Sequence, residues 1–98
     1  MLNEIERPSH TFFMDFTIAD RFGVQAIRDT FRRAFNEWRI DYKMFTELCM
    51  TLNMKCWSYY GTNDTYCDLY RELFHKADNW AVENFRGEKL KYYLAVTD

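Results

Sequence analysis

The sequence predicts an all-α protein, an antiparallel bundle of three long helices with one or two short terminal helices and an aromatic N-terminal arm. Two observations support this prediction. Apolar residues recur every three or four positions in several segments, which is the period of one helix face. The chain also has only 3 Gly and 1 Pro, too few for the many reversals of an all-β fold.

Length and composition favour a single helical domain over residues 1–98. A chain of this size has enough apolar surface for one core only. Hydrophobic residues make up 48% and aromatic residues 19%, which excludes a disordered chain. The formal net charge of −2 is spread evenly along the chain. The overall charge therefore gives no reason to expect binding to nucleic acid or to a membrane.

Residues 1–16 have no sustained period and are interpreted as an arm. Pro8 breaks the chain, and beyond it four large apolar side chains crowd together: Phe12, Phe13, Met14 and Phe16. Leaving them in water would be costly, so we expect them to dock on the bundle. Thr17 is expected to cap a short helix through Phe22, with Asp20 in its first turn, where the helix dipole favours an anion.

Gly23 ends or bends this short helix, and the clearest amphipathic helix follows. From Val24 to Trp38 the apolar residues form one continuous stripe. The next helix, over residues 42–60, is expected to start at an N-cap on Asp41 and to close at Gly61. It is apolar on more than one face, which predicts a central helix covered by neighbours on both sides.

The strongest turn signal precedes the third long helix. Asn63 or Asp64 can cap this helix, and Gly87 stops it. Its apolar stripe runs from Tyr66 to Phe85. Residues 90–94 then suggest a final short helix.

Five aromatic residues near this turn cannot all point inward, because together they span much of a helix circumference: Trp57, Tyr59, Tyr60, Tyr66 and Tyr70. Tyr and Trp often anchor protein contacts, so we interpret this end of the bundle as a partner-binding or self-association surface. In the alternative interpretation, the N-terminal arm covers these aromatics.

Four arginines have a spacing that aligns them along one helix edge: Arg21, Arg28, Arg32 and Arg39. Such a row could grip phosphates or an acidic partner. The alternative, which we favour, is that the arginines cover the border of the core and pair with acids on a neighbouring helix.

Two short motifs suggest nucleic-acid chemistry but fit it poorly. Ala19, Gly23 and Val24 have the spacing of a helix-turn-helix, yet Asp29 stands where that motif needs an apolar anchor. Arg71 and His75 resemble the Arg-and-His motif of helical-bundle ribonucleases of the HEPN type, which usually keep a longer gap between the two residues.

Metal, cofactor and enzyme signals are absent from the sequence pattern. Cys49, Cys56, Cys67 and His75 lack the close pairs of a zinc site, and the cysteines are interpreted as small buried hydrophobes in a reducing compartment. No glycine-rich phosphate loop or nucleophile-and-base pair is recognisable. We expect a non-enzymatic protein without a cofactor.

Several short segments carry a resemblance to a group of proteins: residues 16–23, Asp29 to Phe31, Ala34 and Phe35 with Trp38, Leu52 and Asn53 with Lys55, and Gly87 with Glu88. On these residues the chain is similar to small uncharacterised helical proteins of gut bacteria and their phages or mobile elements. The resemblance covers most of the chain beyond residue 15. It implies an accessory protein and transfers no functional residue.

The sequence therefore predicts a small protein-interaction or accessory protein that binds an unidentified protein or a second copy of itself. The alternative is a nucleic-acid-binding protein that uses the arginine edge. The polar N-terminus and the lack of an apolar run of roughly 20 residues predict neither a secretory leader nor a membrane span, and the cytoplasm is the expected location.

Overall fold

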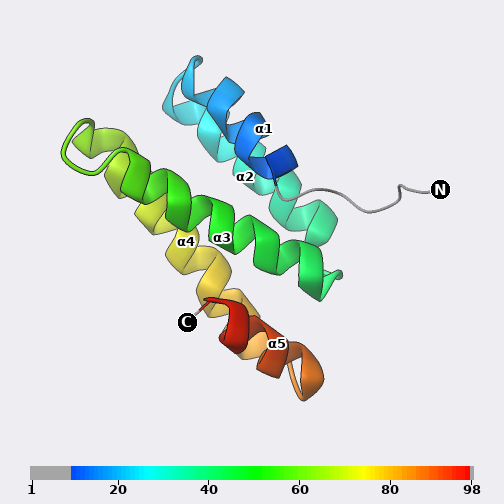
Figure 1. Ribbon diagram of the computed structural model, residues 1–98. Helices are drawn as coiled ribbons and strands as arrows, with labels where there is room; N and C mark the ends of the chain where they lie inside the picture. Colours follow the sequence, from blue (N-terminus) through cyan, green and yellow to red (C-terminus); the bar gives the residue numbers. More distant parts are fainter. Residues whose placement is uncertain (1–9, 98) are drawn as a thin grey trace.

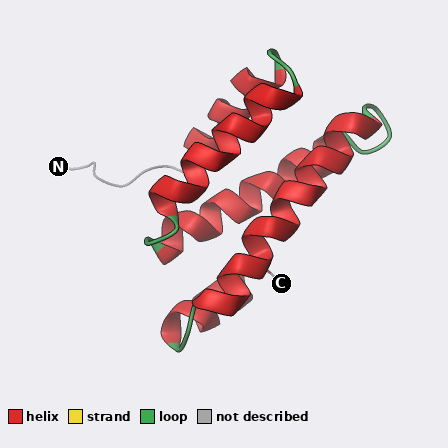
Figure 2. Cartoon of the chain, turned by 180° about the vertical axis from the view of Figure 1, so that it is seen from behind, coloured by secondary structure: helices red, strands yellow, loops and turns green. Residues whose placement is uncertain are grey.

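The computed structural model describes residues 10–97, and this part of the chain is all-α, as predicted (Figures 1 and 2). The helices are α1 (His10–Asp20), α2 (Val24–Trp38), α3 (Tyr42–Ser58), α4 (Asp64–Asn84) and α5 (Glu88–Thr97). Two helical hairpins, α1–α2 and α3–α4, pack on each other, and α5 folds back against α3 and α4 (Figure 1). None of the helices between residues 10 and 97 is both long and apolar enough to cross a membrane.

The central helix is α3, as its apolar residues on several faces predict. It packs against all four other helices and buries residues along most of its length. Phe45, Leu48, Cys49 and Leu52 have no exposed surface. Around Phe45, the rings of Phe35, Trp80 and Phe85 lie at centroid distances of 5.0–5.9 Å, which joins α2, α4 and the α4–α5 turn in one aromatic core.

The two N-caps predicted for the long helices are confirmed. The Asp41 carboxylate accepts a hydrogen bond from the Met44 amide at 3.1 Å, and the Asn63 side chain accepts one from the Tyr66 amide at 3.1 Å. Each cap satisfies a backbone donor that the first helical turn leaves unpaired. Of the two residues proposed for the cap of α4, Asn63 is the one that caps it.

The predicted start of the first helix is wrong. The helix begins at His10, not after Thr17, and the Thr17 hydroxyl donates to the Phe13 carbonyl one turn back rather than capping an N-terminus. Asp20 is the last residue of α1, not part of its first turn. Residues 10–16 of the predicted arm are thus helical, whereas residues 1–9, including Pro8, lie outside the described part of the chain.

The buried face of α1 carries Phe12, Phe16 and Ala19, which confirms the predicted docking for Phe12 and Phe16, whereas the prediction is wrong for Met14, which is 56% exposed. Phe12 meets Trp38 edge-to-face, and Phe16 meets Tyr70 in the same way. At the end of α1 the chain reverses through Gly23, whose φ of 108° lies in the region that favours glycine. The helices α1 and α2 run alongside each other in both views, unlike the steeply crossing helices of a helix-turn-helix (Figures 1 and 2).

Candidate functional site

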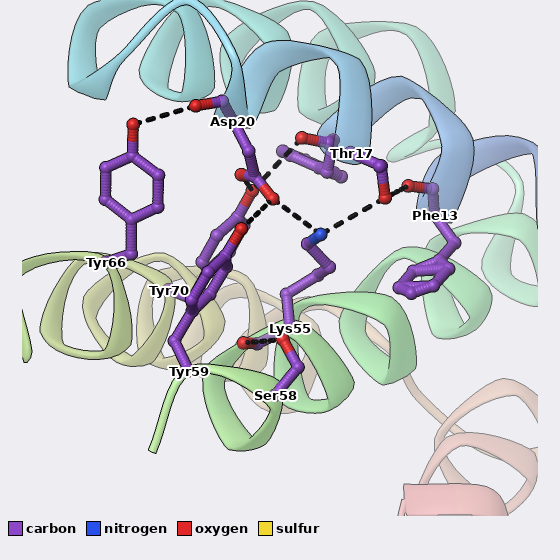
Figure 3. Close-up of polar contacts among 9 residues, drawn as sticks. Phe13, Thr17, Asp20, Lys55, Ser58, Tyr59, Tyr66 and Tyr70 are labelled. Atoms are coloured by element: carbon purple, nitrogen blue, oxygen red, sulfur yellow. Dashed lines mark hydrogen bonds and ion pairs between the residues drawn. The ribbon is translucent and has the colours of Figure 1, made fainter. Parts of the chain in front are cut away.

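The most concentrated polar chemistry in the described residues surrounds Asp20, at the C-terminal end of α1 (Figure 3). The Asp20 carboxylate forms an ion pair with Lys55 of α3, with 2.6 Å between Nζ and Oδ2. It also accepts a hydrogen bond from the Tyr59 hydroxyl at 2.5 Å and another from the Tyr70 hydroxyl. The Tyr66 hydroxyl donates to the Asp20 backbone carbonyl at 2.9 Å. Three helices therefore converge on one carboxylate.

Lys55 is the cation of this cluster, and its side chain is only 5% exposed. Besides the ion pair, its ammonium donates to the Thr17 hydroxyl at 3.2 Å. It also lies 4.8 Å from the centroid of the Phe13 ring and 5.4 Å from that of Tyr59, within the range of cation–π attraction. The charge is thus enclosed by an acid, a hydroxyl and aromatic faces.

The buried surroundings raise the pKa values of two tyrosines in this cluster, Tyr59 and Tyr70. Burial raises the pKa of Tyr59, and the hydrogen bond and negative charge of Asp20 raise it further. The same causes, in the same order, raise the pKa of Tyr70. Both phenols consequently stay protonated and serve as hydrogen-bond donors to the carboxylate. A carboxylate at a helix C-terminus faces an unfavourable dipole, and these donors together with Lys55 offset it.

The two charges of this cluster are enclosed within the fold, since the side chains of Lys55 and Asp20 are 5% and 8% exposed. None of the three hollows described below is lined by Asp20 or Lys55, so no substrate reaches the pair through them. What the cluster does is tie α1 to the α3–α4 hairpin. The lysine is the residue that sequence reasoning missed, although its position between Leu52, Cys56 and Tyr59 on the apolar face of α3 is a detectable signal.

The five predicted partner-binding aromatics divide into two groups. Tyr70 has no exposed surface and Tyr59 and Tyr66 are half-buried, so all three belong to the Asp20 cluster and Tyr70 cannot contact a partner. Tyr70 packs on Phe16 of the predicted arm, whereas Tyr59 and Tyr66 bond to Asp20, which lies beyond residues 1–16. Trp57 and Tyr60 are 63% and 64% exposed, and their rings meet at 5.4 Å.

The predicted arginine edge is partly used within the fold. Arg28 forms a bidentate contact with Glu72 of α4, at 3.0 and 3.2 Å, and Arg32 pairs with Asp29 at 3.1 Å. Arg21 and Arg39 are exposed. The Arg28–Glu72 pair agrees with the favoured interpretation, in which acids on a neighbouring helix pair with the arginines, whereas Asp29 lies on the same helix as Arg32. Nucleic-acid binding along the edge stays a prediction, and two of its four cations already have carboxylate partners.

An exposed apolar row on α1 was not predicted as a surface. Met14 and Ile18 lie one helical turn apart on α1, opposite the buried face, and Phe22 in the following turn is 77% exposed. Ile18 and Phe22 border a hollow of about 470 Å³ between α1 and α2. Its lining includes three alanines that are buried or half-buried, Ala19, Ala26 and Ala34, and four charged residues that are more exposed, Asp15, Asp29, Arg33 and Glu37.

Two further hollows lie on other faces. One of about 380 Å³ lies between α2 and α4, beside Arg28, Arg32, Lys76 and Trp80. The other, of about 210 Å³ between α3 and α4, brings Arg71 and His75 together with Asn53, Cys56, Trp57 and Phe74. Arg71 is paired there with Asp68 at 3.1 Å, and the His75 ring packs on Phe74.

The three cysteines are free and buried, as the sequence predicts. Cys56 and Cys67 lie with their sulfur atoms 3.8 Å apart. Within residues 10–97 no three His, Cys, Asp or Glu side chains are grouped closely enough to hold a metal ion. Comparison with protein families, with characterised proteins and with solved structures finds no match to this chain.

Proposed function

We propose that this chain is a non-enzymatic protein-interaction module that pairs with a second copy of itself through the α1–α2 face. The observation that supports it best is the exposed row of Met14, Ile18 and Phe22 beside an alanine-lined hollow. Isolated exposed apolar residues are ordinary on protein surfaces, but an aligned row next to a hollow is typical of a contact site.

A second copy suits this face because the face carries both a projection and a recess. In a two-fold contact each surface meets an identical surface, so a protruding side chain needs a hollow on the same patch. Phe22 supplies the projection, and the space above Ala26 and Ala34 supplies the recess. The exposed pair of Trp57 and Tyr60 is a weaker candidate, because its two rings contact each other and the hollow beside Trp57, of about 210 Å³, has less than half the volume.

The charges that line the hollow also suit an antiparallel pair. Asp29 and Arg33 are four residues apart on α2, so they lie one turn apart on the same face, and both border the hollow. A two-fold axis midway between them sets each Arg33 against Asp29 of the second copy. Such complementarity contributes to register and specificity more than to affinity.

The proposal is tested by sedimentation velocity over a range of protein concentrations. The wild type is expected to form a concentration-dependent dimer, and Ile18→Glu and Phe22→Glu to shift it to monomer. Both positions are exposed, so neither substitution should unfold the chain. The matched control is Ile40→Glu, since Ile40 is 85% exposed in the α2–α3 turn, away from the hollow.

A charge swap examines the register. Asp29→Arg and Arg33→Glu should each weaken the dimer, because each places like charges together, and the double variant should recover it. A wild type that stays monomeric up to roughly millimolar concentration would overturn self-pairing. The resemblance to small helical proteins of gut bacteria and mobile elements suggests an accessory role, and the location proposed for the protein is the cytoplasm.

A further inference from the structure

The thiols of Cys56 and Cys67 form a pair that the proposed function does not use. Cys56 lies in the last turn of α3 and Cys67 in the first turn of α4, so the pair bridges the hairpin next to its turn. Their sulfur atoms are 3.8 Å apart, and both residues are less than 10% exposed. Sulfur atoms this close on different helices need only a small movement to reach the bonding distance of about 2.05 Å.

Two further observations make this pair chemically different from a buried, inert thiol. The Arg71 guanidinium donates to the Cys67 sulfur at 3.6 Å, and the same cation lowers the pKa of the Cys56 thiol, whose thiolate is the reactive form. Cys56 borders the hollow of about 210 Å³ between α3 and α4, which opens a route for a small molecule to its sulfur. Cys49 borders none of the three hollows described.

We propose that Cys56 and Cys67 are a redox modification site, at which hydrogen peroxide converts the two thiols into an intramolecular disulfide. The Cys56 thiolate attacks one peroxide oxygen, the O–O bond breaks, and Cys56 becomes a sulfenic acid while hydroxide leaves. The Cys67 thiolate, held beside Arg71, then attacks the sulfenic sulfur and releases a second hydroxide. The two thiol protons combine with the hydroxides to give two waters, and two electrons pass from sulfur to peroxide.

The reaction should be slow near neutral pH and faster in mild alkali. Burial raises the pKa of the Cys56 thiol, and the neighbouring Cys67 adds to the increase, while Arg71 partly opposes it. Burial also raises the pKa of Cys49, to about 12, so this third thiol stays protonated and unreactive. Cys49 therefore serves as an unreactive control thiol within the same molecule.

The test treats the full chain with hydrogen peroxide and follows intact mass and a peptide map without reduction. The expected product is a monomer lighter by about 2 Da, the mass of two hydrogens, with Cys56 linked to Cys67. Dithiothreitol should restore the original mass. Cys49→Ala should form the same bond, whereas Cys56→Ala and Cys67→Ala should not. Should an alanine variant fail to fold, the map of the wild type still decides which cysteines are joined.

Arg71 is tested against a matched arginine. Arg71→Met should slow disulfide formation several-fold at neutral pH, and the difference should shrink as the pH rises, because hydroxide then ionises the thiols without help. Arg32→Met is the control, since Arg32 makes the same 3.1 Å pair with an aspartate three residues earlier and has no cysteine beside it. A link through Cys49, a link between two chains, or stepwise oxidation of single cysteines to sulfinic acids would overturn the proposal.

Discussion

At the scale of single residues, the charged pair of Asp20 and Lys55 decides how α1 is held. Both side chains are less than 10% exposed, so neither charge retains much of its hydration. A buried ion pair is not by itself a strong source of stability, because desolvation offsets much of the attraction. The hydrogen bonds from Tyr59 and Tyr70 to the carboxylate, and that from Lys55 to Thr17, replace the hydrogen bonds that water would make to the two charges. The pair therefore specifies one docking position for α1.

Removing one partner of this pair should be severely destabilising. Asp20→Asn leaves the Lys55 ammonium buried without its acid, and Lys55→Met leaves the carboxylate without its cation. Each substitution should lower the free energy of unfolding by about 3 kcal/mol or more, measured by urea denaturation at neutral pH. The double variant should cost less than the sum of the two, since it leaves neither charge unpaired.

The exposed pair of Arg28 and Glu72 is the control for these measurements. Its side chains are 37% and 46% exposed, so Arg28→Met should cost no more than about 1 kcal/mol although the contact is bidentate. Equal losses for the two pairs, or a strictly additive double variant at Asp20 and Lys55, would contradict the role given to the buried cluster.

The tyrosines of the cluster predict a loss of stability in alkali. The pKa values of Tyr59 and Tyr70 in the folded protein lie above the ordinary 10.0, because burial and the Asp20 carboxylate disfavour the phenolate. Above about pH 10 the unfolded chain releases phenolic protons that the folded chain keeps. Their contribution to stability is thus complete below that pH and is lost as the pH rises beyond it.

Urea midpoints measured between about pH 8 and pH 11 check this direction. Tyr59→Phe should lower stability at neutral pH through the lost hydrogen bond, yet flatten the decline above pH 10, because one of the retained protons is gone. Tyr60→Phe, at an exposed position five residues after Lys55 in the α3–α4 turn, should leave the decline unchanged. A wild type whose stability is constant across this range would refute the prediction.

Sequence reasoning found residues whose role is local and missed residues whose role depends on a distant partner. The caps at Asp41 and Asn63 were predictable because a cap bonds to the backbone only three residues away. Asp20 was assigned to a helix start because its partners are 35 to 50 residues away in the chain. Lys55 lies on a stripe of apolar residues. Its partner Asp20, which compensates the buried charge, is identified only by the fold.

At the scale of helices, α1 was the element that local pattern described least well. Its sequence carries two apolar rows, one through Phe12, Phe16 and Ala19 and another through Met14 and Ile18, which points on toward Phe22 in the turn after the helix. Because both rows contribute apolar residues, the helical spacing of each row is obscured, and the sequence of this segment shows no regular period. The structure separates them, since the first row is buried and the second is exposed. In α2 and α4 a single row dominates, and both helices were predicted with nearly correct ends.

The N-cap of α4 offers a quantitative check at this scale. Asn63→Ala removes the acceptor of the Tyr66 amide, so it should lower the free energy of unfolding by about 1 kcal/mol, measured by urea or thermal denaturation. Thr65→Ala is the matched control in the same turn, where the side chain is exposed, and it should change stability by less than about 0.5 kcal/mol. An Asn63→Ala variant as stable as this control would show that the cap contributes nothing.

At the scale of the whole molecule, the fold class and the central place of α3 followed from periodicity, but the uncovered faces did not. Periodicity identifies which residues share a face, and it does not identify what covers that face. The sequence thus indicated an excess of large apolar residues and located it at residues 57–70. In the fold, three of that group contact Phe16 or Asp20 of α1, and the exposed row lies on α1 and the turn that follows it. The excess was predictable, whereas its position required the packing of the two hairpins.

If the α1–α2 face pairs with a second copy, thermal stability must depend on protein concentration. A partner that binds only the folded chain stabilises it by mass action, and each tenfold rise in concentration contributes about 1.4 kcal/mol per dimer. For a domain of this size that corresponds to a rise in Tm of a few degrees per decade of concentration. Phe22→Glu should abolish this dependence while its Tm at high dilution stays near that of the wild type, because Phe22 is exposed in the single chain. Ile40→Glu should retain the wild-type slope. A Tm that does not change with wild-type concentration, or a slope that survives in Phe22→Glu, would remove the α1–α2 face from the interface.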